Sequence, residues 1–228
     1  MYCKFFKRFF DIIFSALGLI ILSPLLLITY ILVVIFLGFP GIFKQERPGK
    51  DGKIFKLYKF RTMTNEKDKD GRLLPDNQRL PKFGKFLRST SLDELPELFC
   101  ILFGKMSVVG PRPMLVRDMV FFDKKTLRRQ NVMPGLTGWA QANGRNSLTW
   151  NDRFKHDIYY VNNLSFLMDV KVIFLTIKTV IKREGIGEDG GDLSIDYGDY
   201  LLKHNKVSKK EYDKKLLEAK KILERANK

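Results

Sequence analysis

The 228-residue sequence has few of the side chains on which metal and nucleophile sites are most often built. Its two histidines, His156 and His204, lie in no H-E-x-x-H arrangement. Its two cysteines, Cys3 and Cys100, suggest neither a disulfide framework nor a metal-ligand cluster. There is no G-x-x-x-x-G-K-[ST] loop, and no G-x-G-x-x-G turn follows a predicted strand. Any chemistry is therefore expected to depend on carboxylates and cationic side chains.

Acidic residues are also scarce relative to basic ones. The chain has 41 Lys and Arg against 25 Asp and Glu, which gives a formal net charge of +16. Such an excess favours anionic lipid headgroups, phosphorylated small molecules or nucleic acid as partners. No helix-turn-helix, RNP-like strand or zinc module accompanies the charge, so we do not expect nucleic acid to be the partner.

One long segment lacks charge altogether. Residues 12–43 include no Lys, Arg, Asp or Glu, and Ser23-Pro24 interrupts the middle. About 20 apolar residues suffice for a membrane-spanning helix, but proline removes a backbone donor and divides this run into two short arms. Basic residues flank both ends, namely Lys4, Lys7, Arg8, Lys44, Arg47, Lys50 and Lys53. Since basic flanks stay on the cytoplasmic side, we expect a re-entrant helix, with a kinked single span as the alternative.

The fold class predicted for the chain is α+β and mostly helical. Residues 1–40 form the re-entrant helix, 41–185 one compact domain, and 186–228 a linker with a Lys-rich helix over 208–228. Residues 41–46 and 54–63 read as two strands around a Gly-rich turn, followed by an irregular polar excursion over 65–80. Helical patterns cover residues 96–103, 114–129, 150–162 and 166–183.

The segment from Arg88 to Pro96 has the strongest chemical signal. Adjacent carboxylates at Asp93 and Glu94, near a helix start, are suited to act as a nucleophile or as Mg²⁺ ligands. Ser91 and Glu94 also match a capping box, which would make these acids structural. Pro96 lies too far into such a helix, so we expect irregular local geometry.

Cationic and polar side chains in glycine- and proline-rich contexts supply possible partners for a phosphorylated ligand. An arginine held in a rigid loop suits bidentate phosphate recognition. Glycines at 135, 138 and 144 allow close backbone approach, and Trp139 either stacks on a base or belongs to the core. The candidates are Lys59, Arg61, Arg88, Arg112, Gln141, Asn143 and Arg145.

Four motifs together resemble the monotopic polyprenol-phosphate phosphoglycosyl transferases, a family of bacterial sugar transferases. The likeness runs over residues 2–183, and most narrowly it is to the short single-domain members that begin Campylobacter-type protein N-glycosylation. The motifs are Lys59-Phe60-Arg61-Thr62-Met63, Arg88-x-x-Ser91-Leu92-Asp93-Glu94-Leu95-Pro96, Val109-Gly110-Pro111-Arg112-Pro113 and Pro134-Gly135-Leu136-Thr137-Gly138-Trp139-Ala140-Gln141.

The resemblance implies that residues 41–185 transfer a phosphosugar from a UDP-sugar to undecaprenyl phosphate, release UMP and require Mg²⁺. It implies that Asp93 is the nucleophile, forming a covalent phosphosugar intermediate, and a metal contact, with Glu94 as base or positioning group. We assign Arg88 and Arg112 to phosphate, Lys59 to the acceptor side, and Gln141 with Arg145 to the nucleotide. These assignments are hypotheses.

The resemblance also implies a place in the cell and a donor. Both ends of the re-entrant helix would lie on the cytoplasmic face of the bacterial inner membrane, beside anionic lipids and possible downstream glycosyltransferases. An N-acetylated, bacillosamine-type donor is expected by resemblance alone. Two alternatives without catalysis are a membrane-anchored basic scaffold and a nucleic-acid-binding protein, and both leave the Asp93-Glu94 pair without a purpose.

Overall fold

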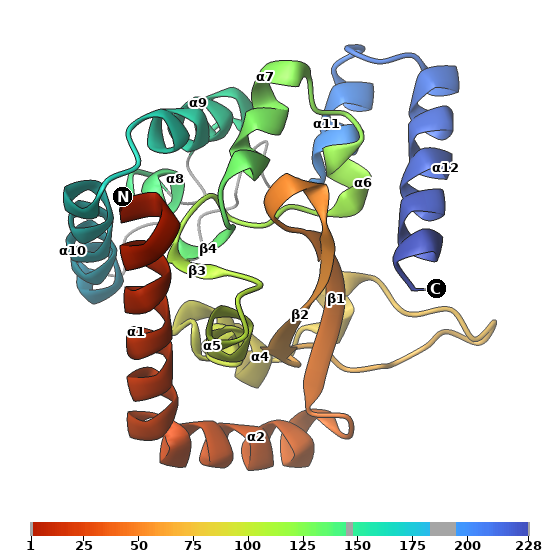
Figure 1. The fold of residues 1–228 in the computed structure, drawn as a ribbon. Helices are drawn as coiled ribbons and strands as arrows, with labels where there is room; N and C mark the ends of the chain where they lie inside the picture. Colours follow the sequence, from red (N-terminus) through yellow and green to blue (C-terminus); the bar gives the residue numbers. More distant parts are fainter. Residues whose placement is uncertain (1, 145–147, 183–194, 228) are drawn as a thin grey trace.

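The computed structural model describes residues 2–144, 148–182 and 195–227. Two N-terminal helices form a bent frame along the left and lower edges of the molecule, and a long β-hairpin stands opposite the first of them (Figure 1). Helix α5 (Glu97–Leu102) lies inside this frame, and shorter helices cover the other end of the hairpin. The described chain is mostly helical with a small sheet, as predicted.

The apolar run folds as two helices that meet at the predicted break. Helix α1 (Lys7–Ile21) follows a short π-helix, Tyr2–Phe6, and α2 (Ser23–Leu37) begins at the Ser23-Pro24 pair. The two axes are bent by 64°. Within the described residues no single helix has the length and apolarity of a membrane span, whereas this bent pair does when taken together.

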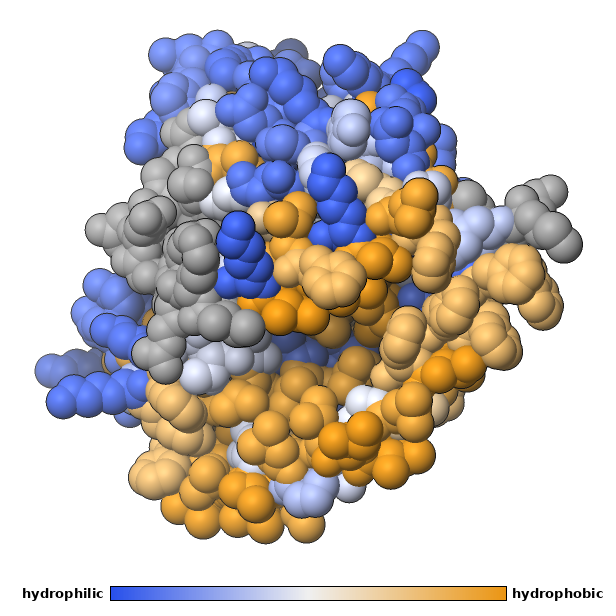
Figure 2. Space-filling view, turned by 90° about the vertical axis from the view of Figure 1, so that its left-hand side faces the viewer, coloured by the Kyte–Doolittle hydropathy of each residue, from blue (hydrophilic) through white to orange (hydrophobic). Residues whose placement is uncertain are grey.

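Helix α1 turns its polar side inward. Lys7, Asp11 and Ser15 recur every four residues and are buried against the domain. The Lys7 ammonium lies 2.6 Å from the Asp169 carboxylate and donates to the Val109 carbonyl. This inverted amphipathic pattern leaves the apolar side of the helix facing outward, and apolar residues gather over α1 and α2 in Figure 2.

Two of the basic residues that precede the apolar run also bind the domain. Lys7 is buried, and Arg8 donates to the carbonyls of Ile101 and Leu102 at the end of α5. Arginine satisfies carbonyls that a helix end leaves unpaired. These two cations fasten α1 to the domain.

The predicted hairpin is confirmed. Strands β1 (Ile42–Pro48) and β2 (Ile54–Phe60) pair antiparallel around a 3₁₀ turn, Lys50–Gly52. The second strand stops three residues before the predicted end, opposite Ile42, where its partner strand begins. The Arg61 guanidinium beyond it donates to the Gly38 carbonyl at 2.7 Å.

Helix predictions beyond the two N-terminal helices were confirmed at four places and wrong at one. Helices α5, α9 (Trp150–Asn162), α10 (Phe166–Lys182) and α12 (Lys209–Ala226) lie where they were expected. The single helix predicted over residues 114–129 is instead α6 (Val116–Met119), α7 (Lys124–Leu127) and a 3₁₀ turn, Arg128–Asn131. The Asp123 carboxylate accepts from the backbone NH of Thr126 and so caps a new helix.

Several short elements were not predicted at all. They are α3 (Asp76–Arg79), α4 (Lys82–Ser89), α8 (Trp139–Ala142), α11 (Tyr197–Lys203) and the parallel strands β3 (Ser107–Val109) and β4 (Gly135–Thr137). The predicted linker falls mostly within residues 183–194, which lie outside the described residues.

The C-terminal helices pack onto the family-like part of the chain. Ala219 of α12 lies in one core cluster with Val116 of α6 and with Val120, which directly follows that helix. At the next turn, the Arg117 guanidinium lies 3.0 Å from the Asp199 carboxylate of α11. The Lys-rich C-terminal helix is therefore docked on the domain.

Candidate active site

A polar cavity of about 640 Å³ lies beside the end of the hairpin, between the strands, α4 and the 3₁₀ turn Leu92–Glu94. Seven residues were assigned a role in the reaction, and five of them line this cavity: Lys59, Arg88, Asp93, Glu94 and Arg112. The irregular excursion over residues 65–80 contributes a further part of the wall. The cavity thus brings together side chains from three of the four sequence motifs.

The two adjacent acids are positioned by a tight backbone turn. Ser91 has a positive φ of 56° and its side chain makes no capping hydrogen bond, so the capping-box alternative is wrong. The acids lie in the 3₁₀ turn Leu92–Glu94, and a new helix begins only at Glu97, directly after Pro96. The irregular geometry predicted around Pro96 is confirmed.

The Glu94 carboxylate is held by two cations. It accepts hydrogen bonds from the Lys59 ammonium at 2.7 Å and from the Arg112 guanidinium. Burial opposes ionisation of this carboxyl, but the charges of Arg112 and Lys59 outweigh that effect and hold its pKa well below the usual range. Glu94 is therefore ionised and fixes both cations in place.

Glu97 completes this cluster and was missed in the sequence. Its side chain is 2% exposed, and its carboxylate lies 3.0 Å from the Lys59 ammonium. Burial raises its pKa, and the charge of Lys59 opposes that rise. An acid four residues after Asp93, at the start of an apolar helix, was the available signal, but first-turn acids are common at helix starts and did not single it out.

Asp93 differs from its neighbour in having no partner. Its side chain is 8% exposed, and within the described part of the chain its carboxylate accepts no hydrogen bond. Burial and the adjacent Glu94 charge raise its pKa to about 6, although Lys59, Arg112 and Arg88 lower it. The carboxylate is thus desolvated and uncommitted, which suits a nucleophile.

Two arginines of the cavity are held at its edges. Arg88 donates from Nε to the Thr62 hydroxyl at 3.0 Å. Arg47 was considered only as a flanking cation, yet it lines the cavity and its buried Nε has no hydrogen-bond partner among the described residues. Burial and the nearby Arg112 lower its pKa to about 10, so it stays charged. Both guanidiniums add positive charge around Asp93.

The remaining candidates lie elsewhere. Gln141 is on α8, does not line this cavity, and donates to the Leu136 carbonyl at 3.3 Å. Arg145 lies outside the described residues. Trp139 packs on Tyr159 with ring centroids 5.6 Å apart, which supports the core alternative for this side chain.

The glycines of the two predicted loops bring backbones together. A Cβ on Gly110 would lie 2.3 Å from the Met133 carbonyl oxygen, and one on Gly135 would lie 2.0 Å from the Gly110 nitrogen. Only glycine permits this approach, which forms the short parallel pair β3–β4. The loop that carries Arg112 is anchored in this way beside the cavity.

The cavity was also tested for a metal site. Across the residues that the structure describes, no group of three or more His, Cys, Asp or Glu side chains is placed to hold a metal. Mg²⁺ is often held by one or two carboxylates together with substrate phosphates. The uncommitted Asp93 carboxylate suits that mode, since Glu94 is already bound by cations.

Sequence comparison agrees with the geometry. The bacterial sugar transferase family matches residues 2–183. The uncharacterized sugar transferase EpsL of Bacillus subtilis (strain 168) is 48% identical over 180 residues, covering 79% of this chain and 89% of EpsL.

Two longer relatives are named for defined donors. The UDP-glucose:undecaprenyl-phosphate glucose-1-phosphate transferase of Klebsiella pneumoniae is 44% identical over 75% of this chain and 39% of its own length. A UDP-N-acetylgalactosamine-undecaprenyl-phosphate N-acetylgalactosaminephosphotransferase of Aeromonas hydrophila is 35% identical over 79% and 45%. The chain spans less than half the length of these two proteins, but the family match covers most of it. The chain therefore belongs to the bacterial sugar transferase family and is a transferase.

Proposed function

We propose that the protein transfers a phosphosugar from a UDP-sugar to undecaprenyl phosphate, giving undecaprenyl-diphosphate-sugar and UMP. The observation that carries the proposal is the pair of adjacent acids in a cationic cavity. Glu94 is bound by two cations, and Asp93 is bound by none among the described residues. The names of the relatives from Klebsiella and Aeromonas supply the class of donor and acceptor.

The reaction runs in two displacements at one phosphorus atom. An Asp93 carboxylate oxygen attacks the β-phosphorus of the donor, and the bond from that phosphorus to the bridging oxygen breaks, which releases UMP. A phosphate oxygen of the acceptor then attacks the same phosphorus, and the Asp93 carboxylate leaves. Covalent catalysis of this kind replaces one difficult step by two easier ones.

The cations have separate roles in this scheme. Arg88 and Arg112 neutralise the donor phosphates, and Lys59 faces the incoming acceptor phosphate. Such charges stabilise the transition state because they are already fixed in place. The contacts of Glu94 with Lys59 and Arg112 support the positioning role for this acid, because a carboxylate with so low a pKa accepts a proton poorly. Gln141 and Arg145 remain predictions for the nucleotide.

Mg²⁺ is proposed as the metal of the reaction, held by Asp93 and the donor phosphates. When bound, it would neutralise charge on the diphosphate and favour the departure of UMP. The cationic side chains of the cavity, Arg47 among them, share that task by balancing the remaining negative charge.

The donor sugar is the finest part of the proposal. The N-acetylated, bacillosamine-type donor and a role in N-glycan assembly stay predictions from resemblance. The relatives named above include glucose and N-acetylgalactosamine among their donors, and EpsL shares most of its length with this chain. Whichever sugar is the donor, we propose the same role. The protein catalyses the first membrane step of glycoconjugate or polysaccharide assembly, ahead of downstream glycosyltransferases.

The site of action is proposed to be the cytoplasmic face of the bacterial inner membrane. The bent pair α1–α2, with its outward apolar side, supports a re-entrant segment that keeps both ends on one side among anionic lipids. Replacing Pro24 by alanine tests the role of the break. If both ends of the segment stay cytoplasmic in a cysteine-accessibility assay of this variant, the proline is not what turns the chain back.

Release of UMP tests the whole reaction. The purified full chain should release many UMP molecules per chain only when both a UDP-sugar and undecaprenyl phosphate are present. A panel of UDP-sugars should identify the donor. A chain that binds membranes but releases no UMP with any donor would instead support the non-catalytic scaffold.

A further inference from the structure

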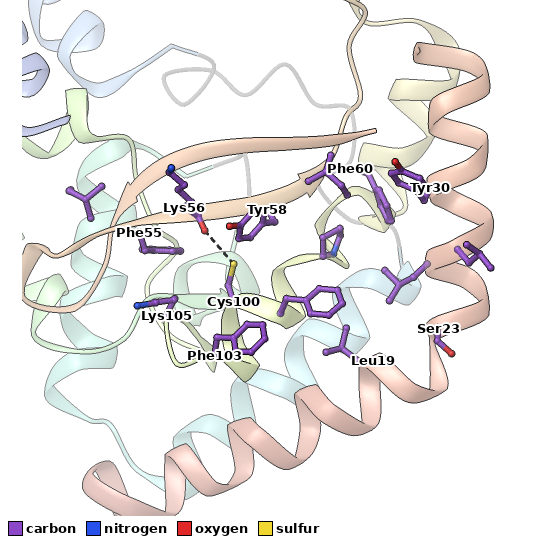
Figure 3. Close-up of a pocket in the computed structure, with 16 residues that line it drawn as sticks. Leu19, Ser23, Tyr30, Phe55, Lys56, Tyr58, Phe60, Cys100, Phe103 and Lys105 are labelled. Atoms are coloured by element: carbon purple, nitrogen blue, oxygen red, sulfur yellow. Dashed lines mark hydrogen bonds between the residues drawn. The ribbon is translucent and has the colours of Figure 1, made fainter. Parts of the chain in front are cut away.

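A second cavity, of about 950 Å³, lies inside the frame made by α1, α2, the hairpin and α5. Its wall is apolar apart from two lysines and a few polar groups, and Figure 3 shows lining residues from all four elements. The lining residues used below are Leu27, Tyr58, Phe60, Pro96, Phe99 and Phe103.

This apolar cavity and the polar cavity that contains Asp93, called the catalytic cavity below, lie on opposite faces of the hairpin. Side chains alternate along a strand, so Lys59 points into the catalytic cavity while Tyr58 and Phe60 line the apolar one. Phe60, at the end of β2, lines both. Pro96 of the apolar wall is only two residues beyond Glu94, so the two cavities adjoin where the acids are held.

Part of the apolar wall stays exposed to solvent. Leu27 is 61% exposed and Phe103 is 71% exposed, although both line the cavity. Exposed apolar surface of this extent marks a binding site for an apolar ligand or a membrane. A sugar nucleotide is charged and hydrated, so it would not leave water for this cavity.

We propose that the apolar cavity holds the isoprenoid chain of the acceptor, an inference that rests on the proposed function. Of the two substrates, only the acceptor combines an apolar chain with a phosphate that must reach Asp93. A chain seated below Phe60 would bring that phosphate to the end of β2, where Lys59 is fixed by Glu94 and Glu97. Donor and acceptor then approach Asp93 from opposite faces of the hairpin.

Filling the cavity tests the proposal. Leu27→Trp places a bulky ring at an exposed lining position of α2, and Ile35→Trp is the matched control, since Ile35 is 67% exposed on the same helix but does not line the cavity. We expect Leu27→Trp to raise the KM for undecaprenyl phosphate about tenfold. The KM for geranyl phosphate, with two isoprene units, should change much less, and Ile35→Trp should change neither.

The donor half-reaction serves as the internal control. Labelling of the protein by a UDP-sugar alone should proceed at the wild-type rate in both variants. If no variant and no wild-type protein is labelled, the proposed function fails. If labelling is normal but Leu27→Trp raises both acceptor KM values equally, or matches Ile35→Trp, the apolar cavity does not hold the chain and a general effect on membrane binding is indicated.

A second variant on another element protects the test against misfolding. Phe103→Glu puts a charge at the exposed end of α5, where the free energy of unfolding depends little on this side chain. It should also raise the KM for the long acceptor and spare that for the short one. Unchanged KM values for both acceptors would overturn the proposal.

Discussion

The two cavities on either face of the hairpin differ in whether their side chains are already bound within the protein. In the catalytic cavity Glu94 is bound by Lys59 and Arg112, whereas Asp93 beside it makes no hydrogen bond or ion pair with any residue that the structure describes. In the apolar cavity the side chains of Leu27 and Phe103 remain largely exposed. The comparison indicates one site preassembled by charge pairing and one completed by an apolar ligand.

The same contrast exists at smaller scale between the adjacent acids. Cations hold the pKa of Glu94 well below its usual range, whereas burial and Glu94 raise that of Asp93 to about 6. Two carboxyls whose pKa values are driven apart commonly have different tasks. In the proposed reaction, Glu94 organises the cations and Asp93 is left to react.

The largest effect short of removing the nucleophile is expected when that organisation is broken. Glu94→Gln leaves Lys59 and Arg112 without their shared carboxylate, so labelling by a UDP-sugar should slow about a hundredfold. Because the pair is partly exposed, the free energy of unfolding should fall by only about 2 kcal/mol, measured by denaturant titration. The pH dependence of labelling should keep its shape, and loss of one limb would instead identify Glu94 as a general base.

Removing one cation should cost less. Arg88→Gln keeps the hydrogen bond to Thr62 within reach but removes a charge from the donor side of the cavity. A lost charge-assisted hydrogen bond predicts about a tenfold rise in the KM for the UDP-sugar, measured by UMP release. The KM for undecaprenyl phosphate should not move. A shift of the acceptor KM alone would show that the two cavities are assigned to the wrong substrates.

Acid should inhibit the reaction in the catalytic cavity but not the binding of the protein to membranes. The Asp93 carboxyl, with its pKa raised to about 6, is ionised above pH 6 and protonated below it. Labelling should therefore fall about tenfold for each pH unit below 6, in a stopped single-turnover assay. Membrane binding by the apolar frame, measured by vesicle flotation, should not follow that curve. A labelling rate that stays constant down to pH 5 would contradict this assignment of the pKa.

The smallest effect is expected in the apolar cavity. Phe103→Ala removes an exposed ring, so folding should be unaffected while the KM for undecaprenyl phosphate rises a few-fold. Labelling by the UDP-sugar should be unchanged in the same preparation. A change in labelling would mean that this wall supports the catalytic cavity instead.

Much of the fold followed from local pattern. Proline, turn residues and the spacing of apolar residues are visible within a single segment of sequence. They predicted the break at Ser23-Pro24, the hairpin and helices α5, α9, α10 and α12. The broken helix over residues 114–129 was missed because the Asp123 cap competes with a continuous apolar pattern. The burial of Lys7 depends on Asp169, 162 residues away, which no local pattern shows.

The candidate site was predicted to a similar degree. Motifs rich in arginine, glycine and acids indicated five residues that do meet in one cavity. Glu97 was missed because its partner, Lys59, comes from another element. Arg47 was missed because its place in the cavity depends on which face of β1 turns toward the site. The apolar cavity was not predictable, since it is formed by four elements whose relative placement is set by tertiary contacts.

The most direct test of the account is labelling of Asp93 itself. Purified protein mixed with a UDP-sugar carrying a radioactive sugar, without acceptor, should gain one phosphosugar on the peptide that contains Asp93, and undecaprenyl phosphate should then remove it. Asp93→Asn should abolish the label, whereas Asp70→Asn, in the exposed excursion, should not. A label that persists in Asp93→Asn would contradict the assignment of Asp93 as the nucleophile.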